Sequence, residues 1–208
     1  MRASLSQAVI ETGMLQPRAS DLHERIRHPK AGTRYLLVID SSGSHAAQQR
    51  MRQVKGAASD LLTRSFKHGD EVAILVFRGT AAQVILEPSG MLQEAMTALE
   101  YLPTGGRTPL AHALDCARGY VTPTTLLILL SDGRANVAIT RGDPWQEALE
   151  LARQIKVRAL VIDTETSSEP LGRLHTLAEA LGAEYVRLEI PDLNDCAART
   201  LSRVTEMP

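Results

Sequence analysis

Short apolar runs alternate along the chain with stretches of helical periodicity. The runs Tyr35–Ile39 and Leu126–Leu130 are almost wholly apolar, which is typical of strands buried on both faces. In Gln48–Phe66, by contrast, apolar positions recur every three or four residues, as they do in an amphipathic helix. Strands that alternate with helices in this way predict a mostly parallel sheet with helices on both faces.

We therefore expect a doubly wound α/β domain whose sheet has about six strands. Residues Gln83–Leu86 follow the turn residues Arg78 and Gly79 closely, which predicts one antiparallel strand at an edge. The predicted strands span residues 35–39, 72–77, 83–86, 126–130, 157–162 and 184–188, and the predicted helices span 48–66, 91–102, 109–120, 144–155, 171–181 and 192–204. The domain is expected over residues 31–208, after a polar lead-in segment at 1–30.

Composition and charge exclude several classes of function. The chain has 208 residues, with 23 basic and 24 acidic side chains, so its net charge of -1 creates no long-range attraction for nucleic acid. Only 3% of residues are aromatic, which also argues against stacking on single strands. No apolar run reaches the roughly 20 residues that a membrane span needs. The first residues contain no apolar core of a signal peptide, and we expect a cytoplasmic protein.

Oxygen-bearing side chains follow two of the predicted strands and precede a helix. Residues 40–44 have the form D-x-S-x-S directly after the first strand, Asp132 follows the apolar strand 126–130, and Thr108 ends a glycine-rich loop. In parallel sheets such strand ends meet at one edge, where ligands bind. Carboxylates and hydroxyls suit hard cations. The sequence thus predicts one divalent-cation site, formed by Asp40, Ser42, Ser44, Thr108 and Asp132.

This set of ligands indicates docking rather than catalysis. If the hydroxyls bind the ion directly and the carboxylates act mostly through water, the ion keeps much of its charge. One open coordination position then attracts a carboxylate of a partner protein. Arg78, Arg107 and Arg134 lie near the same edge and are candidates for orienting that partner. Solvated loop arginines or internal ion pairs are an equal alternative for these three residues.

Each predicted ligand also has a purely local explanation. Asp40 with Ser42, and Asp132 with Gly133, are ordinary turn residues. Thr108 precedes Pro109 and is a good candidate for a helix N-cap, a role compatible with metal binding. The chain has no G-x-S-x-G, H-E-x-x-H or G-x-x-x-x-G-K-[ST] motif, so neither a nucleophilic triad nor a nucleotide site is expected. A metal-dependent phosphatase or hydrolase of doubly wound fold remains an alternative.

The motifs together resemble the metal-ion-dependent adhesion site of von Willebrand factor A (integrin I-like) domains. The strings P-T-G-G-R-T-P-L at 103–110 and D-G-R-A-N at 132–136 are most similar to the C-terminal integrin I-like domain of the scaffold subunit of magnesium chelatase. Similarity to that domain runs from about Asp21 to Leu188. The scaffold subunit also has an AAA+-like region and an acidic, proline-rich linker that this sequence lacks, so we expect either an excised domain or a short stand-alone relative.

The resemblance implies a non-catalytic docking domain that binds Mg²⁺, or Mn²⁺ or Ca²⁺, through the five residues named above. It implies a protein partner that presents an acidic residue to the metal. In chlorophyll or bacteriochlorophyll biosynthesis the implied partners are an AAA+ ATPase subunit and the large porphyrin-binding subunit of the chelatase, which the scaffold subunit joins. The alternative is a stand-alone domain that works with a MoxR-type AAA+ chaperone.

Overall fold

A computed structural model describes residues 32–43, 47–165 and 171–187, and these residues form six strands and five helices. The strands are β1 (Arg34–Asp40), β2 (Glu71–Arg78), β3 (Ala81–Ser89), β4 (Thr125–Ser131), β5 (Arg158–Asp163) and β6 (Glu184–Arg187). The helices are α2 (Ala47–Ser65), α3 (Leu92–Glu100), α4 (Leu110–Arg118), α5 (Pro144–Gln154) and α6 (Arg173–Leu181). The predicted lead-in segment 1–30 and the predicted helix 192–204 lie outside the described residues.

The strands form one sheet in the order β3-β2-β1-β4-β5-β6. All neighbours pair in parallel except β2 and β3, so the antiparallel strand lies at an edge, as predicted. The chain builds outward from β1 to β3 on one side and then returns to add β4, β5 and β6 on the other. The direction of winding therefore switches between β1 and β4, and the predicted doubly wound fold is confirmed.

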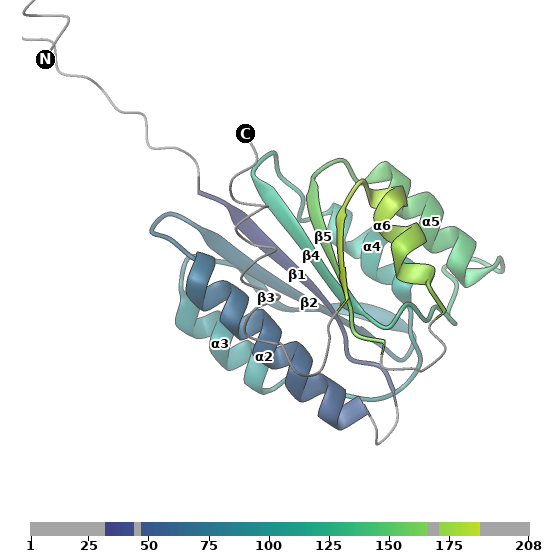
Figure 1. Cartoon of the computed structure of the whole chain (residues 1–208), viewed down its shortest axis with the longest axis horizontal. Helices are drawn as coiled ribbons and strands as arrows, with labels where there is room; N and C mark the ends of the chain where they lie inside the picture. Colours follow the sequence, from purple (N-terminus) through teal and green to yellow (C-terminus); the bar gives the residue numbers. More distant parts are fainter. Residues whose placement is uncertain (1–31, 44–46, 166–170, 188–208) are drawn as a thin grey trace, which may run out of the picture. The chain divides into compact units, whose positions relative to one another are not determined.

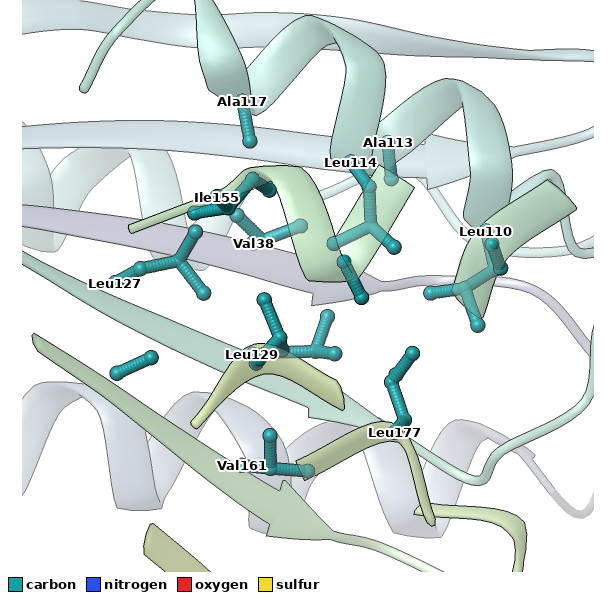
Figure 2. Close-up of a cluster of buried hydrophobic side chains, with 14 of the residues drawn as sticks. Val38, Leu110, Ala113, Leu114, Ala117, Leu127, Leu129, Ile155, Val161 and Leu177 are labelled. Carbon is teal, nitrogen blue, oxygen red and sulfur yellow. The ribbon is translucent and has the colours of Figure 1, made fainter. Parts of the chain in front are cut away.

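Side chains that alternate along the central strands build two separate cores. Leu36 and Val38 of β1 point to the face covered by α4, α5 and α6, whereas Leu37 and Ile39 point to the face covered by α2 and α3 (Figure 1). In the first core, Val38 and Leu129 of the sheet pack beneath side chains of the covering helices (Figure 2). Burial on both faces explains why the central strands are continuous apolar runs.

No helix in the described part of the chain is long and apolar enough to cross a membrane.

Two loops at the carboxyl edge of the sheet approach each other through glycines. Gly106 has a positive φ of 96°, and a Cβ atom added to it would lie 3.0 Å from the backbone nitrogen of Gly79. A side chain is thus disfavoured there both by backbone conformation and by close approach. This contact fixes the loop before α4 against the turn between β2 and β3.

We expect Gly106→Ala to lower the free energy of unfolding by about 1–3 kcal/mol, because the loop must distort or move away from Gly79. Gly56→Ala is the matched control. Gly56 lies exposed inside α2 and an added Cβ meets no atom within 4 Å, so this change should stabilise the domain by about 0.5–1 kcal/mol. Urea unfolding monitored by circular dichroism measures both. Equal effects of the two substitutions would contradict the proposed contact.

Candidate metal centre

Asp40 lies at the point where the winding of the sheet switches direction. It is the last residue of β1, and Ser131 is the last residue of the neighbouring strand β4. The Ser131 hydroxyl donates a 2.8 Å hydrogen bond to Asp40 Oδ2, and the Ser42 backbone N–H donates a 3.0 Å bond to Asp40 Oδ1. Asp40 is buried, so these two donors fix the orientation of a carboxylate that has little contact with water.

The hydroxyls of Ser42 and Thr108 meet in front of this carboxylate, from positions 66 residues apart. Their oxygens lie 2.8 Å apart, and either can be the donor. Thr108 is held by Asn136, whose side-chain oxygen accepts from the Thr108 N–H at 2.7 Å and whose own N–H donates to the Thr108 carbonyl at 3.1 Å. The loops that carry Thr108 and Asn136 therefore move as one unit.

The structure contradicts the local explanation of Thr108 and agrees with the local explanation of the two aspartates. The N-cap explanation of Thr108 is wrong, because α4 begins at Leu110, its N-cap position is Pro109, and no side chain caps it. The proline was expected at the first helical position but lies one residue before it. The Thr108 hydroxyl is consequently available to Ser42. The turn explanation holds for both aspartates, since Asp40 accepts from Ser42 N–H and Asp132 accepts from Arg134 N–H at 3.2 Å.

The two aspartates are close enough to influence each other. Burial and, secondly, the negative charge of Asp132 raise the pKa of Asp40 from an ordinary 3.8 to about 6, although hydrogen bonds from Ser42 and Ser131 oppose the shift. Asp132 is also buried. Two buried carboxylates beside a pair of hydroxyls form a site that favours a cation.

Backbone hydrogen bonds tie the loop after β1 to the glycine-rich loop. Gly43 N–H donates to the Gly106 carbonyl at 3.2 Å, and Gly105 N–H donates to the Ser41 carbonyl at 2.8 Å. Gly43, Gly105 and Gly106 all have positive φ values, which glycine adopts most easily. The reciprocal bonds hold Ser42 and Thr108 at a fixed separation.

The hydroxyl oxygens of Ser42 and Thr108 lie 2.8 Å apart, which is a hydrogen-bond distance. Hydroxyl and carboxylate oxygens are the donors that hard cations such as Mg²⁺ and Ca²⁺ prefer. In the described part of the chain no three His, Cys, Asp or Glu side chains cluster, so the available donors are carboxylates mixed with hydroxyls.

Four of the five predicted ligands are thus described, and they converge on one edge of the sheet. Ser44, the fifth, lies outside the described residues. Two further residues, Ser131 and Asn136, were not predicted as part of the site. Ser131 could have been found from its place at the end of β4, beside the strand that ends at Asp40. Asn136 belongs to the D-G-R-A-N string, but nothing in its sequence position indicates that it binds Thr108.

The three predicted partner-binding arginines are exposed around this site. Arg107 Nη2 donates to the Asn136 carbonyl at 2.6 Å, and Arg134 Nε lies 3.7 Å from Asp132 Oδ2. Arg78 ends β2, next to the turn at Gly79. Internal contacts therefore account for part of the role of Arg107 and Arg134, yet each retains exposed guanidinium surface.

Comparison with known proteins agrees with the fold. A family model of the von Willebrand factor type A domain matches residues 35–134. The crystal structure of conserved hypothetical protein BatB from Bacteroides thetaiotaomicron is similar with a TM-score of 0.63 at 19% identity, over 85% of this chain and 100% of that one. A von Willebrand factor type A structure from Catenulispora acidiphila is similar with a TM-score of 0.61 at 18% identity, over 85% and 42%.

Relatives of higher identity include subunits of magnesium chelatase. The 67 kDa subunit of Chlorobaculum parvum is 34% identical, over 90% of this chain and 33% of the relative. The 60 kDa subunit of Rhodobacter capsulatus is 37% identical, over 82% of this chain and 32% of the relative. The chain thus spans about a third of the length of these relatives. It therefore carries a von Willebrand factor type A domain and is related to the magnesium-chelatase 60 and 67 kDa subunits.

Proposed function

We propose that this domain docks a partner protein through a bound magnesium ion. In this proposal Asp40, Ser42, Ser44, Thr108 and Asp132 hold the ion, and a carboxylate of the partner takes a remaining coordination position. The observation that carries the proposal is the Ser42–Thr108 hydroxyl pair, 2.8 Å apart beside two buried carboxylates. The domain itself would not be the catalyst. The domain would present a cation whose positive charge is only partly neutralised by the side chains that hold it.

The relation to chelatase subunits supports a chelatase-type assembly in chlorophyll or bacteriochlorophyll biosynthesis as the setting. The proposed partners are an AAA+ ATPase subunit and the large porphyrin-binding subunit, in the cytoplasm. A MoxR-type ATPase as partner would use the same site in the same way. The two settings differ in which ATPase the domain retains when Mg²⁺ is present.

The residues around the ion have separable tasks. The hydroxyls of Ser42 and Thr108 would contact it, because neutral oxygens leave its charge available to the partner. Asp40 would contribute its negative charge from the buried side of the ion, and the Ser131 hydroxyl would hold its carboxylate in that orientation. Asn136 would hold Thr108 in place from behind. Because residues that orient metal ligands affect affinity almost as the ligands do, loss of Ser131 or Asn136 should weaken the site as well.

Calorimetric titration tests the metal site. We expect the wild type to bind one Mg²⁺ and Asp40→Asn to bind it at least about 100-fold more weakly, because the amide removes the nearest negative charge. Ser131→Ala should cost about 10- to 100-fold, since it only removes the donor that orients Asp40. Asp115→Asn, at an exposed carboxylate on α4, is the control and should bind like the wild type. Equal affinities of the wild type and Asp40→Asn would remove Asp40 from the site.

Asp40→Asn should weaken metal binding, but in the absence of metal it should stabilise the folded domain. The pKa of Asp40 is about 6 in the folded state and lower when unfolded, so the folded state holds this proton more tightly. Its contribution to stability is therefore present at low pH and is lost as pH rises from about 4 to 6. With chelator at pH 8, Asp40→Asn should unfold at higher urea, with a gain of about 1–3 kcal/mol. Near pH 4 the gain should disappear, and a pH-independent difference would disprove this origin.

Docking is tested with a short peptide that carries one aspartate among glutamines. Amide NMR signals of the domain, Gly43 and Gly133 among them, should shift on adding the peptide in the presence of Mg²⁺. The shifts should vanish with chelator or in Asp40→Asn, because the carboxylate then has no ion to bind. Shifts that persist in chelator would argue against a metal bridge. Chelator-sensitive retention of a chelatase ATPase, but not of a MoxR-type ATPase, would then decide between the two settings.

A further inference from the structure

Within the described loops around the predicted metal site, most exposed charged side chains are arginines. The loops that surround the hydroxyl pair comprise residues 41–43, 78–80, 101–109 and 132–143, called here the rim loops. They expose the arginines Arg78, Arg107, Arg134 and Arg141. The one exposed carboxylate among these residues is that of Asp143, which accepts bonds from the N–H groups of Trp145 and Gln146 and so caps α5. The rim therefore offers cations to a partner and no uncommitted exposed carboxylate.

Three of these arginines lie on segments that contact the loops of the hydroxyl pair. Arg107 directly precedes Thr108, and its guanidinium is anchored on the Asn136 carbonyl at 2.6 Å. Arg134 lies 3.7 Å from the carboxylate of Asp132. Arg78 precedes Gly79, whose backbone contacts the Gly106 position. The three arginines are consequently carried by loops that contact one another.

The basic residues of the rim loops are arginines, and arginine side chains suit planar anions such as carboxylates. The rim loops contain no lysine. An arginine guanidinium can bind a carboxylate through two parallel hydrogen bonds, which a lysine ammonium cannot do. The anchored nitrogen of Arg107 leaves further donors on the same guanidinium. The whole chain has a net charge of -1, so it does not attract polyanions in general.

A single partner carboxylate on the metal would leave Arg78 and Arg107 without an anion, because only Arg134 of these three arginines lies beside a carboxylate in the described part of the chain. We propose that the rim arginines select an acidic segment, one in which the carboxylate that binds the metal is flanked by further glutamates or aspartates. This inference rests on the proposed metal-dependent docking and specifies its partner. In this proposal Arg78 and Arg107 pair with the flanking carboxylates.

Two short labelled peptides test the proposal by fluorescence anisotropy in excess Mg²⁺. Both carry one central aspartate, flanked by glutamates in one peptide and by glutamines in the other. The glutamate peptide should bind at least about tenfold more tightly, as expected for added charge-assisted hydrogen bonds. Arg107→Ala and Arg78→Ala should each lower the ratio of the two affinities toward one, and Arg107→Lys should give an intermediate ratio. Arg153→Ala, at an exposed arginine in the last turn of α5, should change nothing.

The outcomes separate this inference from the function on which it rests. Equal binding of the two peptides by a domain that takes up Mg²⁺ in calorimetry overturns the role of the arginines and leaves the metal site intact. Absence of Mg²⁺ uptake overturns the proposed function itself. Tighter binding of an oligothymidylate that is insensitive to chelator would assign the arginines to phosphate and overturn the inference as well.

Discussion

The withdrawal of two carboxylates from water is the constraint on which the carboxyl edge of this sheet depends. Asp40 ends β1, Asp132 follows the neighbouring strand β4, and both side chains are buried. The fold compensates with hydrogen bonds to Asp40 from Ser42 and, to a smaller extent, from the Ser131 hydroxyl. These donors only partly offset burial, as the raised pKa of Asp40 shows. The charged form of Asp40 therefore costs the folded domain stability, and in the proposed function a bound divalent ion would offset that cost.

The architecture of the domain explains how such a site can be built. Parallel strands place the ends of β1 and β4 side by side, while the covering helices carry the chain away on both faces (Figure 1). Loops from distant parts of the sequence can then meet without distorting the core. Glycine contacts and reciprocal backbone bonds hold these loops together, so the rigidity of the sheet extends to the side chains of Ser42 and Thr108.

Much of the fold could be predicted because strands that are buried on both faces are continuous apolar runs in the sequence. The predicted strands 35–39 and 126–130 differ from β1 and β4 by one residue at each end. The edge strand was harder to predict, since β3 spans Ala81–Ser89 and only 83–86 was predicted. Its half-exposed positions and Pro88 interrupt the apolar run. Of the site, the four described ligands were predicted by their places at strand and loop ends. The contacts of Ser131 with Asp40 and of Asn136 with Thr108 depend on tertiary packing that no local pattern encodes.

The position of β1 in the sheet has a further consequence for local opening. β1 has a hydrogen-bonded neighbour on each side, whereas the edge strands β3 and β6 have one neighbour among the described strands. Structural fluctuations of a domain begin where few contacts must break, and central strands exchange their amide protons last. Asp40 is therefore carried by the part of the domain that stays closed longest. Transient fraying of either edge would leave the hydrogen bonds of Asp40 with Ser42 and Ser131 undisturbed.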